Sequence, residues 1–258
     1  MEPELRLRIA RKSALEIVRR YGIERPEHIR IEDIAWAVGA EIVVGNLTGA
    51  TARLSRLGSR SRIRLSARVD HSGHRRFSIA HELGHLVLKH KTSIRFCDER
   101  DMHDFRGGST AEAEANAFAS ELLLPEPLVR RRCEVSPVSL DVVAKIADDF
   151  STSMTATAFR FARLTSERCA AIYSVDGDVK YFFKSDSFWP FIPKRPLDPY
   201  SLAYDYFHKG RVPDCGETVD ASAWLDLEER HGLDEIFEHS MAIPVLNAVL
   251  SLLWIPER

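Results

Sequence analysis

The chain has few cysteines, four in 258 residues, and no two of them form a C-x-x-C pair. Such scattered thiols argue against a disulfide framework and against a zinc site made of paired cysteines. Long hydrophobic runs are missing as well, because no uninterrupted apolar stretch approaches the length of roughly 18 residues that a membrane-spanning helix needs. Near the start, the charged residues Glu2, Glu4 and Arg6 interrupt any apolar signal segment. We therefore expect a cytoplasmic protein with no membrane anchor.

A strong net charge is also lacking. The 36 basic and 38 acidic side chains leave a formal charge of −2, so no overall electrostatic field favours nucleic acid or a membrane surface. The hydrophobic fraction of 45% is ordinary for a soluble protein, and the length suffices for one large or two small domains. Composition therefore indicates a folded, soluble protein but suggests no activity.

The segment 77–90, with the sequence FSIAHELGHLVLKH, does suggest an activity. His81 and His85 lie four residues apart in an apolar run of helical spacing, so both imidazoles would lie on one helix face and reach one metal ion. Glu82 would lie beside them, placed to take a proton from a metal-bound water. This is the H-E-x-x-H arrangement of zinc peptidases. The alternative is a core helix whose histidines are satisfied by hydrogen bonds alone.

A third histidine is absent from the place where one class of zinc peptidases has it. The extended signature requires glycine and histidine where this chain has Leu88 and Lys91. We therefore expect a carboxylate ligand on a second helix downstream. Residues 109–124 predict that helix, because the stretch is alanine-rich, begins with Ser109 and Thr110, and ends before Pro125.

Within the second helix, Glu112 and Asn116 lie four residues apart and hence on one face. We expect Glu112 to bind the metal and Asn116 to orient a ligating histidine. Glu114 is a poorer candidate, because it lies on a different face. Glu112 could instead be a solvated residue of an acidic first turn. Other competing ligands lie in a polar loop, namely Asp98, Asp101, His103 and Asp104.

The pattern along the chain predicts an α+β fold in three regions. Residues 1–135 form the zinc metallopeptidase domain, with a helix over 4–21, a strand over 40–44 and a half-buried strand over 62–69 that alternates with arginines. If that strand lay at a sheet edge, it would pair with an extended substrate, and its arginines would favour an acidic or nucleic-acid-associated partner. The alternative is a solvated strand face that resists aggregation.

Two helices separated by a short polar break, Ser151–Ser153, occupy residues 136–166. This layout is compatible with a helix-turn-helix, but its second helix offers only Thr155, Thr157 and Arg160 for contacts to DNA, so we expect packing on the peptidase domain. Residues 167–258 predict a small α+β domain for sensing or specificity. Its expected features are a hairpin around Asp176-Gly177, a loop rich in aromatic residues and proline, a helix near 199–208, and strands over 219–225 and 249–255.

The chain resembles the ImmA/IrrE-type zinc metallopeptidases, an H-E-x-x-H, gluzincin-like family. The resemblance rests on RFSIAHELGH at 76–85, EAEANAFA at 112–119 and LLLP at 122–125, with a similar entry at 31–44. Leu124 replaces a more common methionine of similar volume. The resemblance implies a zincin-like peptidase domain, zinc bound by His81, His85 and Glu112, and Glu82 as catalytic base.

The resemblance also implies a protein substrate. We expect a cytosolic helix-turn-helix repressor or antitoxin-like protein, whose cleavage releases stress-response or mobile-element genes and so regulates transcription. The alternative is a metal-binding transcriptional regulator that holds DNA or a repressor without cleaving it. His90 or His103 would be a second oxyanion-stabilising group. The sequence does not predict an oligomeric state.

Overall fold

The structure is a computed structural model that describes residues 2–47, 49–57, 60–69, 71–90, 110–226 and 232–256. It confirms the α+β class, with helices around two separate sheets. The chain divides into two compact units. Unit 1 comprises Met1–Leu128 and Asp148–Ser153, and unit 2 comprises Val129–Ala147 and Met154–Arg258. Most of the segment 136–166 thus groups with the C-terminal residues, whereas the sequence suggested that it packs on the peptidase domain.

Unit 1 contains a three-stranded sheet in the order β1-β3-β2, made of β1 (Ala40–Gly45), β2 (Ala52–Leu57) and β3 (Arg60–Ser66). β3 pairs with β1 in parallel and with β2 antiparallel. The arginine-rich strand is therefore not an edge strand that could pair with a substrate, because both of its sides are already hydrogen-bonded. Its predicted alternation is confirmed as far as Leu65, since Ile63 and Leu65 are fully buried while Arg64 is exposed. The strand ends at Ser66, before the predicted residue 69, and Ala67 is exposed.

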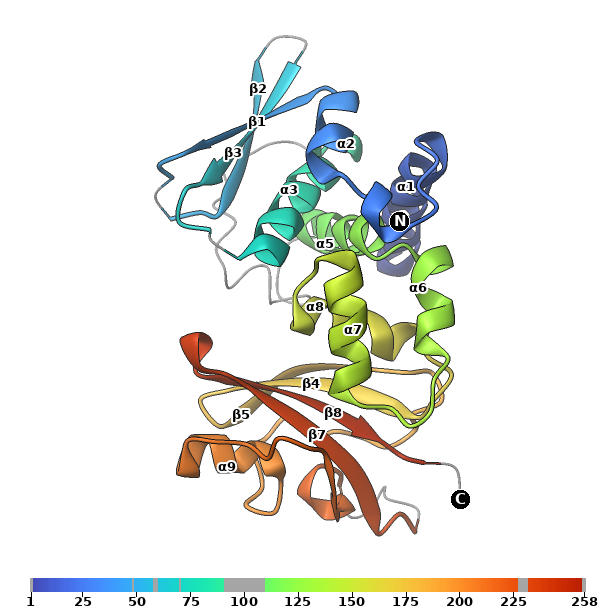
Figure 1. Ribbon diagram of the computed structural model, residues 1–258, viewed down its shortest axis with the longest axis vertical. Coiled ribbons are helices and arrows are strands. Elements are labelled where there is room, and N and C mark those ends of the chain that lie inside the picture. The colour runs from blue at the N-terminus through green and yellow to red at the C-terminus, as the bar shows by residue number, and fades with distance from the viewer. Residues whose placement is uncertain are drawn as a thin grey trace. The chain divides into compact units, whose positions relative to one another are not determined.

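Four helices of unit 1 lie together on one side of this sheet (Figure 1). α1 and α3 each pack against α5, and α3 also contacts β2 and β3. Gly84 permits the close approach of α3 and α5, because a Cβ atom there would lie 3.0 Å from the Cα atom of Ala115. The helices are α1 (Pro3–Arg20), α2 (Ile31–Ala37), α3 (Ser72–Val87) and α5 (Thr110–Leu123), with a short 3-10 turn at Pro26–His28.

Three further helices follow, α6 (Glu126–Cys133), α7 (Leu140–Phe150) and α8 (Met154–Leu164). α8 packs against β4 and β5 of the C-terminal sheet. The three α8 side chains that the sequence offered for DNA contacts are all buried, with exposed fractions of 6% for Thr155, 1% for Thr157 and 5% for Arg160. A recognition helix presents such side chains to a groove, so this burial argues against base reading by α8.

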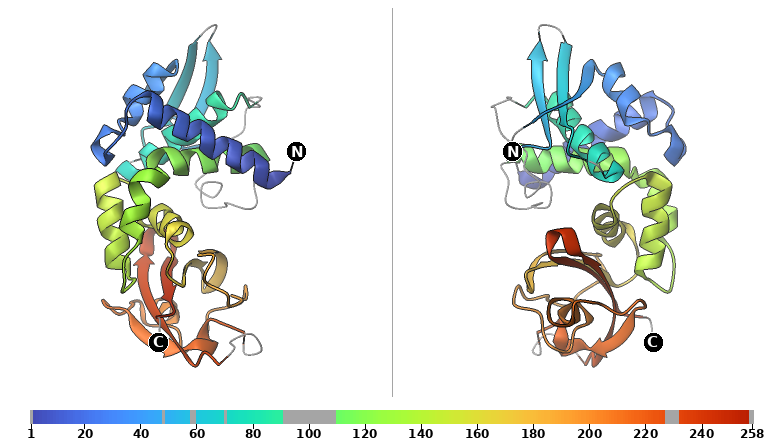
Figure 2. Two further views of the ribbon diagram at one scale, coloured as in Figure 1. Left: turned by 90° about the vertical axis from the view of Figure 1, so that its right-hand side faces the viewer. Right: turned by 60° about the vertical axis from the view of Figure 1, so that its left-hand side comes forward.

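Unit 2 is built on an antiparallel five-stranded sheet in the order β5-β4-β8-β7-β6. α8 lies on one face and α9 on the other (Figures 1 and 2), so β4 and β8 are buried along almost their whole length. The elements are β4 (Cys169–Val175), β5 (Asp178–Lys184), α9 (Leu202–Lys209), β6 (Glu217–Asp220), β7 (Glu235–Ile243) and β8 (Ala248–Trp254), with short 3-10 turns at Ala221–Ala223 and Pro244–Leu246.

The hairpin predicted in this unit is confirmed. Asp176 and Gly177 both have positive φ, at 53° and 83°, as the tight turn between β4 and β5 requires. The strand predicted over 219–225 is shorter than expected, because β6 ends at Asp220, whose side chain accepts a hydrogen bond from the backbone N–H of Ser222 and begins a 3-10 turn. The aromatic loop contributes Phe188 to the core, while Trp189 stays half exposed.

No described helix combines the length and the apolar character that crossing a bilayer demands.

Candidate metal centre

Helix α3 places His81 and His85 side by side, as their spacing predicted. The Nε2 atoms of the two imidazoles are 3.1 Å apart. Apolar neighbours keep this part of the helix in the core, since Ile79, Ala80 and Leu83 are fully buried. His81 itself is only 3% exposed, so its ring cannot be satisfied by water alone. Two nitrogens that face each other at this distance require a proton or a metal ion between them.

Glu112, on the first turn of α5, brings the third donor atom. Its Oε2 lies 3.0 Å from Nε2 of His81 and 3.3 Å from Nε2 of His85. Donor atoms around a tetrahedral ion with bonds of about 2.1 Å would be about 3.4 Å apart, so a small expansion of this triangle is all that separates it from a metal site. The structure thus brings together the three residues that the sequence proposed as ligands.

The other proposed ligands do not join this group. The carboxylate of Glu114 points away from the cluster, and its two oxygens contact Arg6 and His90. Asp98, Asp101, His103 and Asp104 lie outside the described residues, as does Ser109, the expected first residue of the second helix.

Asn116 lies one helical turn after Glu112 and contacts the far side of the His81 ring. Its Oδ1 is 2.8 Å from Nδ1 of His81. The amide oxygen can only accept, so Nδ1 must carry a proton. Nε2 is then the nitrogen that faces Glu112 and His85, and in the neutral ring it is the one that can bind a metal ion. This is the orienting position that the sequence suggested for Asn116. The amide nitrogen Nδ2 has no hydrogen-bond partner among the described residues.

His90 contacts the far side of the His85 ring, at 3.0 Å between the two Nδ1 atoms. Its Nε2 lies 3.0 Å from Oε2 of Glu114. Both ring nitrogens of His90 are therefore in contact with other side chains, and His90 lies on the side of His85 that faces away from Glu112. This placement disfavours the suggestion that His90 stabilises an oxyanion, and His103 lies outside the described residues. The contact could not be predicted from the sequence, because it depends on how the chain turns after α3.

The charges of the site are strongly coupled. Burial alone would lower the pKa of His81, but the hydrogen bond to Glu112 and the negative charges of Glu82 and Glu112 outweigh it and raise that pKa. Burial would raise the pKa of Glu112, yet its contacts with His81 and His85 hold it far below the ordinary value. The carboxylate is thus ionised and attracts a proton or a cation to the two imidazoles. A metal ion satisfies the same three atoms, so the residues present fit one.

Glu82 follows His81 directly and is 4% exposed. Within the described part of the chain, its carboxylate makes no hydrogen bond, whereas Glu112 is held by both histidines. A buried carboxylate that is not engaged can accept a proton from a water molecule held beside it. Glu82 is therefore suited to a role as base and Glu112 to a role as ligand.

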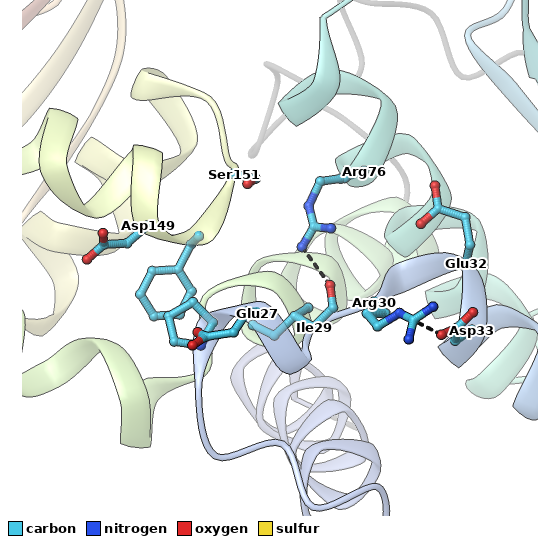
Figure 3. A pocket seen from close by; sticks show the side chains of 10 residues that line it. Glu27, Ile29, Arg30, Glu32, Asp33, Arg76, Asp149 and Ser151 are labelled. Atoms are coloured by element: carbon cyan, nitrogen blue, oxygen red, sulfur yellow. Dashed lines mark hydrogen bonds and ion pairs between the residues drawn. The ribbon is translucent and has the colours of Figure 1, made fainter.

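Unit 1 also has a cavity of about 370 Å³, and none of its lining residues belongs to the metal cluster (Figure 3). Arg76 reaches from α3 toward it and donates a hydrogen bond of 2.9 Å to the carbonyl of Ile29. Arg30 forms an ion pair of 2.8 Å with Asp33. Burial lowers the pKa of Arg76. The charged groups here pair mainly with the protein itself, and Arg76 ties the segment before α2 to the helix that carries the histidines.

Comparisons with known proteins agree with this geometry. Residues 37–162 match the model of the M78 peptidase family described as the IrrE N-terminal-like domain. A solved structure named Mycobacterium tuberculosis transcriptional regulator is similar in fold, with a TM-score of 0.62 and 15% identity, and the match covers 95% of this chain and 75% of that one. A search of curated proteins found no match. The family match includes all three potential ligands, Glu82 and Asn116, so the resemblance to the ImmA/IrrE-type peptidases is confirmed for the domain at residues 37–162.

Proposed function

We propose that the protein is a zinc-dependent endopeptidase that cleaves a cytosolic regulatory protein. The observation that carries the proposal is the triangle of donor atoms from His81, His85 and Glu112. Next to the first ligand lies a buried glutamate, Glu82, whose carboxylate makes no hydrogen bond among the described residues. Two imidazoles and one carboxylate are a ligand set of catalytic zinc sites, which leave one coordination position open. A purely structural zinc site would fill all four positions with protein ligands.

Each residue of the site would have a separate role in the reaction. His81, His85 and Glu112 would hold the ion, and Asn116 would keep the His81 ring in the tautomer that exposes Nε2. Zinc, when bound, supplies a Lewis acid that makes water a better nucleophile and stabilises negative charge on the scissile carbonyl. Glu82 would take the proton from the attacking water at its carboxylate and pass it to the leaving amine nitrogen. The balance is one water consumed and one peptide bond broken.

The substrate class is the finer part of the proposal. The family resemblance supports a helix-turn-helix repressor or antitoxin-like protein, whose cleavage would release stress-response or mobile-element genes. The competing proposal is a metal-binding transcriptional regulator that acts without cleavage. The similar mycobacterial structure is named a transcriptional regulator, and this name is what keeps the competing proposal open. In this chain, the burial of Thr155, Thr157 and Arg160 on α8 weighs against direct DNA reading.

The experiment that tests the proposal is incubation of the purified protein with repressors encoded next to its gene, with zinc present. The variant is Glu82→Gln, and the control is Glu16→Gln, which changes an exposed glutamate of α1. We expect the wild type and the control to cleave, and Glu82→Gln to retain zinc but lose cleavage by a factor of about 10²–10⁴. Undiminished cleavage by Glu82→Gln would refute the assigned role, and signalling that survives in cells carrying this variant would support the non-cleaving regulator.

A further inference from the structure

A continuous chain of polar contacts leads from His85 to the first helix of the protein. Nδ1 of His85 lies 3.0 Å from Nδ1 of His90, and Nε2 of His90 lies 3.0 Å from Oε2 of Glu114. The other oxygen of Glu114, Oε1, accepts a hydrogen bond of 3.2 Å from Nη1 of Arg6 on α1. The side chains of His85, His90 and Glu114 are only 11–12% exposed, and the contacts reach the surface at Arg6, whose side chain is 40% exposed.

The proton positions in this series of contacts follow from its two ends, His85 and Arg6. If Nε2 of His85 is to bind a metal, it must be unprotonated, so Nδ1 carries the hydrogen and donates it to Nδ1 of His90. His90 then has its own hydrogen on Nε2 and donates it to the carboxylate of Glu114. Arg6 donates to the same carboxylate from the other side. While Nε2 of His85 binds a metal ion, this direction of donation keeps every contact in place.

The backbone at the end of α3 is shaped to bring His90 back to His85. Lys89 has φ of 57°, a left-handed conformation that lysine rarely adopts. The backbone N–H of Lys89 bonds to the carbonyl of Leu86, and that of His90 bonds to the carbonyl of His85. This is the Schellman closure of a helix, normally built with glycine at the left-handed position. The closure places the side chain of His90 beside the ring that it contacts.

We propose that His90, Glu114 and Arg6 are positioning residues of the metal centre, which fix the tautomer and orientation of His85 and raise its affinity for the ion. His81 is oriented by the neutral amide of Asn116, whereas His85 is oriented by an imidazole backed by a carboxylate. The two ligands thus differ in the groups behind them, and α1 contributes to metal binding through Arg6. The inference rests on the proposed function for the identity of the ion.

The test measures metal affinity and the tautomer of His85 without any protein substrate. Zinc affinity is obtained by competition with a chromophoric chelator, and the tautomer from the ¹⁵N chemical shifts of the imidazole at pH 8. His90→Leu removes the acceptor, and we expect zinc binding to weaken by about 10–100-fold. His90→Asn keeps an acceptor near the position of Nδ1 and should recover most of the loss. Glu114→Gln should cause a smaller loss, and Arg6→Ala the smallest.

Lys89→Gly is the matched control, because glycine suits the left-handed backbone and leaves the side chains of His85, His90, Glu114 and Arg6 in place. It should keep wild-type zinc affinity and not lower the melting temperature. Equal zinc affinities for wild type and His90→Leu, or a zinc-bound His85 without a proton on Nδ1, would overturn the proposed positioning role. Absence of zinc binding by the wild type would instead overturn the proposed function, whereas a wild type that binds zinc no more tightly than His90→Leu overturns the positioning role alone.

Discussion

Asn116 and His81 are joined by a hydrogen bond of 2.8 Å between Oδ1 of the amide and Nδ1 of the imidazole. Glu112, four residues earlier on the same helix, contacts the opposite nitrogen of the same ring at 3.0 Å. One face of α5 therefore holds His81 from both sides. The carboxylate can share a metal ion with the ring only while the amide keeps the proton on the other nitrogen.

Replacing Asn116 by leucine should weaken metal binding. The substitution removes the acceptor for Nδ1–H at nearly constant side-chain volume, so the ring loses both its fixed tautomer and its fixed plane. We expect a loss of about 10–100-fold in zinc affinity, measured by competition with a chromophoric chelator. Asn116→Asp is the control, since it retains an acceptor at the same place and removes the unpaired amide nitrogen. If the Asn116→Leu variant bound zinc as tightly as the wild type, the hydrogen bond from Asn116 would not be what orients His81.

The metal-free protein should lose stability as the pH rises above neutrality. The pKa of His81 is raised from an ordinary value of 6.5, so its contribution to folding is fully present below that value and is lost as the pH rises through the raised one. The pKa of Glu112 is lowered from 4.5, so its contribution is present above that value and is lost as the pH falls. The pair of His81 and Glu112 therefore stabilises the metal-free fold most between the two ordinary pKa values, 4.5 and 6.5.

Urea unfolding of chelator-treated protein at pH 6, 7, 8 and 9 measures this effect. Saturating zinc should reverse the trend, because the ion binds neutral histidines and competes with protons at low pH. In Glu112→Gln the metal-free slope should become smaller, since the partner that raises the pKa of His81 is gone. A metal-free protein whose unfolding free energy rises from pH 6 to 9 would contradict the assigned coupling.

The local part of the metal site could be predicted from the sequence because it depends on helical periodicity alone. The spacing of His81 with His85, and of Glu112 with Asn116, fixes which side chains share a face whatever the rest of the chain does. What periodicity does not fix is that the two faces meet, and for that the family resemblance and the small residues at the helix contact, such as Gly84, were the available signals.

The remaining features depend on contacts that sequence patterns do not encode. The alternation in β3 identified its buried side but could not show that it takes two neighbours, because strand order follows from pairings distant in sequence. His90 reaches His85 only through a left-handed lysine, a conformation that no propensity favours. β6 stops early because Asp220 caps the next turn in place of continuing the strand.

A buried carboxylate in unit 2 gives a test of that unit's stability. Glu238 on β7 is completely buried, and its oxygens accept four hydrogen bonds. Burial raises the pKa of Glu238, and the donors offset this shift only in part. The backbone N–H groups among them belong to the first turn of α9, so the carboxylate fixes this helix to the sheet. The donors are the N–H groups of Leu202 and Ala203, Nε1 of Trp224 and Oγ of Ser240.

Glu238→Gln should destabilise the protein by about 2–4 kcal/mol, because the new NH₂ group would face donors that it cannot satisfy. Glu235→Gln, on the same strand but exposed, should change the unfolding free energy by less than about 0.5 kcal/mol. Circular dichroism during urea unfolding compares the two. Similar values for both variants would mean that the four hydrogen bonds add nothing beyond an ordinary surface contact.

The thiols should differ sharply in reactivity, which tests the packing around them. Cys133 and Cys169 are completely buried and Cys215 is exposed. Burial raises the pKa of Cys133 to about 12, despite the nearby charges of Arg160 and Arg130, and it raises the pKa of Cys169 as well. At pH 8 only about one Cys133 in 10,000 would be a thiolate, the form that reacts.

Iodoacetamide at pH 8, followed by peptide mass spectrometry, should therefore label Cys215 first. Cys133 and Cys169 should be labelled only when urea unfolds the protein, because neither the reagent nor a negative charge is tolerated in their surroundings. Cys97 lies outside the described residues, and its separate peptide does not affect the comparison. Labelling of Cys169 in the folded protein at the rate of Cys215 would mean that β4 opens readily, which its place between β5 and β8 argues against, since both of its edges are hydrogen-bonded.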